Sequence, residues 1–164
     1  MAVIKPKDVL LGAMIFLMSI VVLIGYGVVQ NQKQEVMQTK QGFENLAEAP
    51  IVINSIKAED APMYNEATIS YTNNTNKIIG QIEFDLLLFD KSGNPIVDTS
   101  SHSSNKHIIN KNQLLPNASV SGKWYIQKGA LIIKARLDKV VFIDGTTWND
   151  PDMGKWIERE ITKY

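Results

Sequence analysis

The sequence predicts an all-β protein, an antiparallel β-sandwich of about seven strands, with a transmembrane helix and a helical stalk before it. Residues 9–29 contain no charged side chain, which is typical of a membrane span. From residue 51 onward, apolar and polar residues alternate with the period of two that a half-buried strand requires. Turn-forming residues separate these stretches, which indicates short strands rather than helices.

The uncharged run 9–29 is long enough to cross a bilayer. At roughly 1.5 Å rise per residue it makes a helix of about 31 Å, against a hydrocarbon core of about 30 Å. We interpret the run as an uncleaved anchor. The alternatives are a cleaved signal peptide with small residues at Gly25-Tyr26-Gly27, and a buried core helix. The predicted anchor residues are Val9, Leu10, Leu11, Ile15, Phe16, Leu17, Ile20, Val21, Val22, Leu23 and Ile24.

The residues around this run predict its orientation. Lys5 and Lys7 precede it, and most of the chain follows it. A short basic tail held inside, with the larger domain exported, is the common single-span arrangement. The chain has no cysteine, which suits an exported domain that needs no disulfide. We therefore expect a single-pass protein of the inner (cytoplasmic) membrane, with its N-terminus inside and its C-terminal domain extracytoplasmic.

The segment between the span and the β domain is polar and tolerant of helix. Val29, Val36 and Phe43 are spaced by seven, as in a short coiled-coil seam, but the intervening seam positions are polar. A solvated helical stalk is therefore the preferred interpretation, and Pro50 marks the start of the domain. The predicted parts are a cytoplasmic tail (1–8), a transmembrane helix (9–29), a polar stalk (30–49), the β-sandwich (50–150) and a C-terminal helix or tail (151–164).

Three segments of the β domain show clear alternation, each with one face predicted to point inward. Trp124 belongs to the third segment, and we expect it to be a core anchor between the sheets; an exposed platform for a ligand is the alternative. The expected inward residues are Ala67, Ile69 and Tyr71 in the first segment, Ile82, Phe84, Leu86 and Leu88 in the second, and Val120, Gly122, Trp124 and Ile126 in the third.

The stretch from Leu86 to Pro95 resembles the FxLYD-type domain, an immunoglobulin-like bacterial module. Its pattern is Phe-x-Leu-Tyr-Asp followed by a glycine turn; here Leu88, Asp90 and Gly93 fit, while Leu86 and Phe89 replace the Phe and the Tyr. Farther on, the segment 141–148 is similar to the closing strand of such domains, and its residues of interest are Asp144, Gly145 and Trp148.

The resemblance implies an Ig-like sandwich in a membrane-anchored, extracytoplasmic bacterial protein, and it implies no catalytic residues. The residues themselves indicate the same structural roles. Leu86 and Leu88 are expected on the core face, Asp90 is expected to accept backbone N–H bonds in a turn, and Asp144-Gly145 is expected to form a hairpin turn with Trp148 folding back onto the sheet.

Signals for catalysis or for a cofactor are weak. The chain has no GxSxG, HExxH, CxxC or glycine-rich phosphate motif. His102 and His107 lie in a polar stretch, and no third metal ligand has a suitable spacing, so we expect a solvated loop, no metal and no cofactor. Asp144, Asp150 and Asp152 gather near one turn, where turn and cap roles are preferred to a calcium site.

These observations favour a membrane-anchored module that binds or positions a protein partner of the cell envelope, and that is not an enzyme. The formal net charge of +0 gives no electrostatic reason to expect nucleic acid as a partner. One alternative is a structural subunit of an envelope or secretion complex, oligomerising through the span or stalk. The other is a small hydrolase or metal-dependent enzyme that uses His102 or His107.

The predicted topology has a direct test. Protease added to intact spheroplasts should digest the C-terminal domain, and carbonate washing should leave the protein in the membrane fraction, because the apolar run anchors it. Protection of the domain from protease would contradict the orientation. A soluble product that starts near Val28 would show instead that the run is a cleaved signal peptide.

Overall fold

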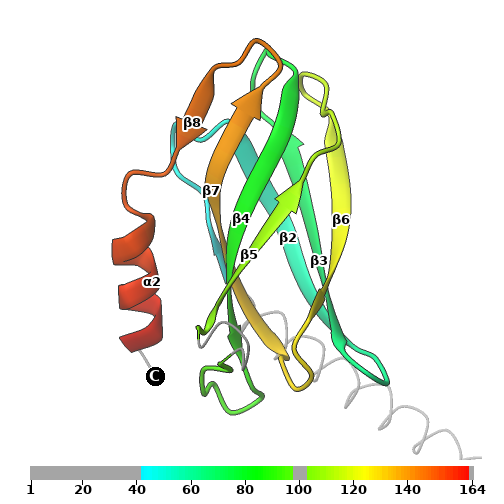
Figure 1. Ribbon diagram of the computed structural model, residues 1–164, viewed down its shortest axis with the longest axis vertical. Coiled ribbons are helices and arrows are strands. Elements are labelled where there is room, and N and C mark those ends of the chain that lie inside the picture. The colour runs from blue at the N-terminus through cyan, green and yellow to red at the C-terminus, as the bar shows by residue number, and fades with distance from the viewer. Residues whose placement is uncertain (1–41, 98–102, 163–164) are drawn as a thin grey trace, which may run out of the picture. The chain divides into compact units, whose positions relative to one another are not determined.

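The computed structural model describes residues 42–97 and 103–162, which form eight β-strands and one helix (Figure 1). The predicted span 9–29 lies outside the described residues, and within them no helix is both long enough and apolar enough to cross a membrane. In chain order the elements are β1 (Gly42–Glu44), β2 (Ile51–Asp60), β3 (Asn65–Asn73), β4 (Ile79–Phe89), β5 (Asn105–Asn110), β6 (Ser119–Ile126), β7 (Ile132–Phe142), β8 (Thr147–Asn149) and α2 (Met153–Thr162).

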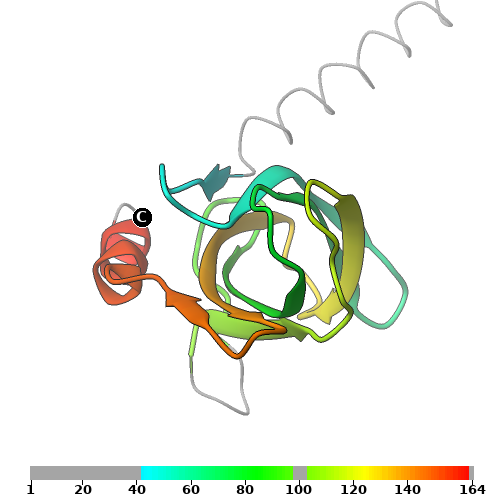
Figure 2. The same ribbon diagram turned by 90° about the horizontal axis from the view of Figure 1, so that it is seen from above.

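The strands form two sheets that enclose one core, as the view from above shows (Figure 2). The larger sheet has five strands in the order β1-β7-β4-β5, with β8 also paired to β7, and the smaller sheet has the order β2-β3-β6. All pairs are antiparallel except β1 with β7, which is parallel. The predicted all-β sandwich is therefore confirmed, and the prediction of a wholly antiparallel arrangement was wrong at β1.

Strand β3 follows the predicted alternation along its whole length. Ala67, Ile69 and Tyr71 are fully buried, and the residues between them are half-buried. This pattern arises because successive side chains of a strand point to opposite faces of its sheet. Tyr71 keeps its hydroxyl satisfied inside the core, since Asn110 Nδ2 donates a hydrogen bond of 2.6 Å to it.

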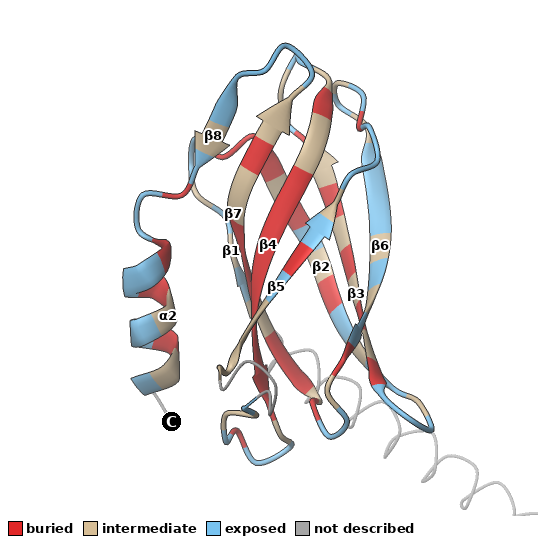
Figure 3. Cartoon of the chain, in the orientation of Figure 1, coloured by how far each residue is buried: buried red, intermediate tan, exposed pale blue. Residues whose placement is uncertain are grey.

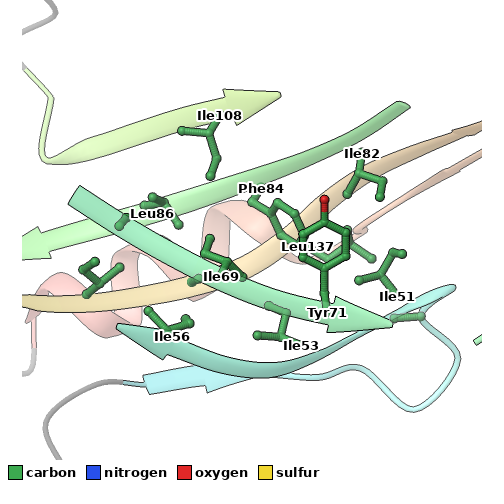
Figure 4. Packing of buried hydrophobic residues seen from close by; sticks show 14 of the residues in the cluster. Ile51, Ile53, Ile56, Ile69, Tyr71, Ile82, Phe84, Leu86, Ile108 and Leu137 are labelled. Atoms are coloured by element: carbon green, nitrogen blue, oxygen red, sulfur yellow. The ribbon is translucent and has the colours of Figure 1, made fainter. Parts of the chain in front are cut away.

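The core consists mainly of branched aliphatic side chains grouped around two aromatic rings (Figure 4). The rings of Tyr71 and Phe84 lie 5.1 Å apart in a tilted arrangement, one from each sheet. Trp124 was expected in this core but only packs against its margin, because its ring turns edge-on to Phe84 and folds over Gly122 on its own strand. Trp124 is thus partly buried: it contacts the opposite sheet through Phe84, at the margin of the core rather than inside it.

Strand β4 is buried on both faces along much of its length (Figure 3). Leu86 and Leu88 point into the main core, as predicted. Leu87 and Phe89 point to the opposite face, where we expected solvent, and are covered by Met153 and Trp156 of α2 together with nearby Ile132. The alternation was therefore right, but the outer face of this half of β4 forms a second apolar cluster.

The domain begins earlier than Pro50. Strand β1 lies within the predicted stalk 30–49, and its three residues pair with Lys134, Ala135 and Arg136 of β7. This pairing satisfies backbone groups that a solvated stalk would leave to water, so residues 42–49 belong to the β domain. The C-terminal part 151–164 contains the helix α2, one of the two forms predicted for it.

Buried ion pairs join β1, β7 and α2. Arg136 makes a bidentate contact with Asp150 just before the helix, at 2.5 and 2.9 Å, and a third bond of 3.0 Å to Glu44 of β1. The guanidinium group is almost completely buried, so loss of these carboxylates would leave a buried positive charge without a partner. Lys134 and Glu160 form a second strand-to-helix pair at 2.6 Å.

The docking of α2 yields a stability prediction. Trp156→Ala should lower the free energy of unfolding of the full chain by about 3–5 kcal/mol, because it removes a large, 2% exposed side chain from the second cluster. Chemical denaturation followed by circular dichroism measures this loss. Lys155→Ala on the exposed side of the same helix is the matched control and should change stability by less than about 0.5 kcal/mol. Equal, small effects of both changes would indicate a detachable helix.

Candidate functional site

The residues of the family-like stretch 86–95 have structural roles. Asp90 accepts hydrogen bonds from the backbone N–H groups of Ser92, at 2.7 Å, and Asn94, at 2.9 Å. Bonds from the Asn94 side chain and backbone hold the pKa of Asp90 below its usual value. Gly93 adopts a φ of 93°, which an L side chain rarely adopts, so the glycine is required by the turn.

The Asp144-Gly145 turn forms as predicted between β7 and β8, with Gly145 at a φ of 83°. Asp144 accepts bonds from Thr146 and from Lys77 Nζ, which lies 2.9 Å away, and these contacts lower its pKa. Trp148, opposite Val140, packs against the main core. This part of the sequence interpretation is confirmed by the structure.

The three aspartates near this turn do not share one site. Asp144 contacts Lys77, Asp150 is buried against Arg136, and the third, Asp152, pairs with Lys155 at 2.7 Å. Each carboxylate therefore has its own cationic partner. This arrangement supports the turn and cap roles that were preferred over calcium binding.

An aromatic corner, defined as Met63, Tyr64 and Tyr125, lies where the β2–β3 hairpin meets β6. The two tyrosine rings contact each other with centroids 4.2 Å apart. Met63 is 84% exposed and Tyr125 is 62% exposed, so most of this apolar area faces water. Strand β6 is also the edge of its sheet.

A second group, here called the acid–histidine cluster, comprises Glu83, Asp85, His107 and Asp138 on the outer face of the larger sheet. His107 Nε2 lies 2.9 Å from Glu83 Oε2, and its Nδ1 lies 3.1 Å from Asp85 Oδ1. Asp138 Oδ2 is 3.9 Å from the same Nδ1. The expectation that His107 occupies a solvated loop was wrong, because it lies on β5 directly opposite Asp85. His102 lies outside the described residues.

A β-bulge brings Asp138 into this cluster. Along β7, Leu137 pairs with Phe84 and Lys139 pairs with Glu83, which leaves Asp138 as the extra residue. Leu137 and Val140 are both buried, so the two residues between them lie together on the outer face. Without the bulge, strict alternation would point one of the two into the core.

The cluster shifts the pKa values of its members. Burial opposes protonation of His107, but Asp85 and Glu83 more than offset it, and the pKa of His107 is raised. Burial raises the pKa of Asp138, and its acidic neighbours Asp85 and Glu83 raise it further. Burial alone would raise the pKa of Glu83. Hydrogen bonds from Gln81 and His107 and the charge of Lys139 outweigh this effect, and the pKa is lowered.

Sequence reasoning missed this cluster because its members come from three strands. Glu83 and Asp85 are on β4, His107 is on β5 and Asp138 is on β7. The two β4 positions alternate with core residues, which placed them correctly on the outer face. The pairing of β4 with β5 and β7, and the bulge, are long-range features that no local pattern indicates.

A family model matches residues 66–163, which extend from β3 through α2 and include the whole acid–histidine cluster. The model describes a family of unknown function, DUF5780. The chain belongs to this family. Strands β1 and β2 precede the region that the DUF5780 model matches. No curated protein matches the chain.

A solved structure with a TM-score above 0.5 supports the fold. A crystal structure of a hypothetical protein from Peptoclostridium difficile 630 is similar, with a TM-score of 0.57 and 16% identity, over 71% of this chain and 92% of that one. The trimeric lipoprotein SadB of Salmonella enterica aligns with 12% identity over 80% of this chain and 78% of its own, at a TM-score of 0.37 that supports no inference. The first likeness concerns the fold alone.

The raised pKa of His107 has a measurable consequence. In metal-free protein, the NMR titration of its ring should give a pKa above the ordinary value of about 6.5, and Asp85→Asn should bring it down. The stabilisation from protonated His107 should be complete below about pH 6.5 and be lost as the pH rises through the folded pKa. Asp60→Asn, remote from the cluster, is the control; an equal drop in both variants would contradict the pairing.

Proposed function

We propose that the protein is a membrane-anchored, extracytoplasmic Ig-like module that binds a protein partner of the cell envelope through the aromatic corner. The exposure of Met63, Tyr64 and Tyr125 at one end of the sandwich is the observation on which the proposal rests. Contact between large apolar side chains and water is unfavourable. Binding of a partner that covers these side chains is therefore favoured by the hydrophobic effect.

The composition of this corner is that of a protein interface. Tyrosine and methionine are enriched at the centres of such interfaces, and charged groups form their rims. Ion pairs of Lys123 with Glu66 and of Lys128 with Asp60 flank the corner and leave its centre apolar. The fixed contact between the tyrosine rings reduces the conformational entropy lost on binding.

The membrane attachment and the orientation rest on the uncharged run 9–29 and on Lys5 and Lys7 before it. The resemblance of residues 86–95 to the FxLYD-type domain supports the same location and the Ig-like fold. Both lines of reasoning concern the sequence. Together they support a partner on the outer side of the cytoplasmic membrane.

A binding role fits the surface better than a catalytic one. The acid–histidine cluster lies on a sheet face, and its residues line neither of two surface hollows, of about 240 and 510 Å³. Most small-molecule sites are concave, so these two hollows give the cluster no support as a catalytic site. We therefore propose a non-enzymatic module.

Site-specific photo-crosslinking in intact cells tests the proposed partner surface. A photoreactive residue in place of Tyr125 should yield a discrete crosslinked product with an envelope protein, because the ring lies at the centre of the proposed contact. The same residue in place of Ile143, which is exposed on the far hairpin, is the control and should yield no such product. Tyr64→Ala should abolish the crosslink from position 125 while leaving the melting temperature within about 2 °C, as for an exposed site.

Equal crosslinking from positions 125 and 143 would contradict the aromatic corner as the contact. A product that survives both Tyr64→Ala and carbonate washing of the membranes would instead indicate a partner held through the span or stalk. That second outcome corresponds to the structural-subunit alternative.

A further inference from the structure

The two nitrogens of His107 face carboxylate oxygens on both sides. An ionised carboxylate only accepts hydrogen bonds, whereas a neutral imidazole has one N–H to donate. At 2.9 Å from Glu83 and 3.1 Å from Asp85, a neutral ring would therefore direct one lone pair at an anionic oxygen. The arrangement requires a cation at that nitrogen, either a proton or a metal ion.

Asp138 adds a further negative charge without a matching hydrogen bond. Among the described residues, the Asp138 carboxylate forms one ion pair, with His107, in which Oδ2 lies 3.9 Å from Nδ1. Lys139 reaches the cluster at Glu83, 3.4 Å away. Three carboxylates therefore share one histidine and one lysine, so negative charge is in excess even when the ring is protonated.

We propose that Glu83, His107 and Asp138 bind a divalent transition-metal ion, with Zn²⁺ as the representative, on the outer face of the larger sheet. One atom from each of these residues lies within 4.8 Å of the others. Zinc bonds of about 2.0–2.2 Å require ligand atoms about 3.4 Å apart, so small side-chain rotations bring the three together. The proposal goes beyond partner binding and does not depend on it.

Asp85 completes the site without binding the ion. In the tautomer with the proton on Nδ1, Asp85 accepts a hydrogen bond from that nitrogen at 3.1 Å, and Nε2, beside Glu83, is the nitrogen open to the ion. Asp138 Oδ2 lies 3.9 Å from Nδ1, so its side chain has to rotate toward Nε2 to join the ligands. A carboxylate on the second nitrogen of a metal-binding histidine orients the ring and raises its basicity. Asp85 is directly opposite His107 in the β4–β5 register, so the backbone fixes this contact.

The donor set distinguishes among metals. An imidazole nitrogen suits zinc, iron, nickel and copper, whereas calcium and magnesium prefer oxygen ligands alone. Two carboxylates neutralise the charge of a divalent ion, and Lys139 remains paired with Glu83 Oε1, the oxygen that does not face the ring. An ion held by β4, β5 and β7 would join three neighbouring strands of one sheet.

Calorimetric titration of the full chain with ZnCl₂ tests the proposal. The protein is purified in detergent without a polyhistidine tag and stripped with EDTA. Wild type should take up one equivalent of Zn²⁺, and excess Mg²⁺ should not displace it. His107→Gln and Asp138→Asn should each weaken binding by tenfold or more, and Asp85→Asn by about 10–100-fold. Asp60→Asn, which removes an acidic side chain outside the cluster, should leave the affinity unchanged.

The absence of saturable uptake by wild type would overturn the proposal, as would equal affinity in the His107→Gln variant. Circular dichroism establishes that each variant is folded. Should the ligand variants fail to fold, His102→Gln leaves His107 as the single histidine of the chain. One equivalent of Zn²⁺ should then shift its ring NMR signals, and unchanged signals would overturn the proposal.

Discussion

The burial of β4 on both faces is the constraint on which the rest of the domain depends. Its inner side chains close the sandwich against β3, and the outer side chains Leu87 and Phe89 require the cover that α2 supplies. Toward its N-terminal half, the same outer face carries Glu83 and Asp85 instead, and α2, the helix of the described residues, packs on the other half. One strand therefore divides the outer surface into a helix-covered apolar half and a polar half, where the acid–histidine cluster lies.

Local patterns predicted the parts of the fold that depend on neighbouring residues. The alternation of Ala67, Ile69 and Tyr71 and the turns at Asp90 and Asp144 are set by side-chain periodicity and by hydrogen bonds within a few residues. Strand β1 escaped prediction because three residues give too short a pattern, and because they pair with residues about ninety positions later. The sequence did not indicate how deeply Trp124 is buried, since hydrophobicity alone does not distinguish a ring enclosed by a core from one that folds over a neighbouring glycine at its margin.

The acid–histidine cluster shows the same limit for a site. Each member is unremarkable in its own segment, and the apolar residues around Glu83 and Asp85 predicted only their face of the strand. Their meeting with His107 depends on the β4–β5 register, and their meeting with Asp138 depends on one extra residue in β7. A bulge changes which face a side chain occupies, so its presence decides whether the cluster has two carboxylates or three.

The pairing of β1 with β7 affects the order in which the chain can acquire its structure. The smaller sheet is complete once Ile126 has been made, but the larger sheet lacks its second strand until β7 exists, and α2 follows last. Contacts between residues far apart in sequence form slowly, because a long loop must close before they contribute. A ribosome or a translocation channel therefore has to deliver the chain through β7 before the domain can close, and β1 has no partner until residues 134–136 arrive.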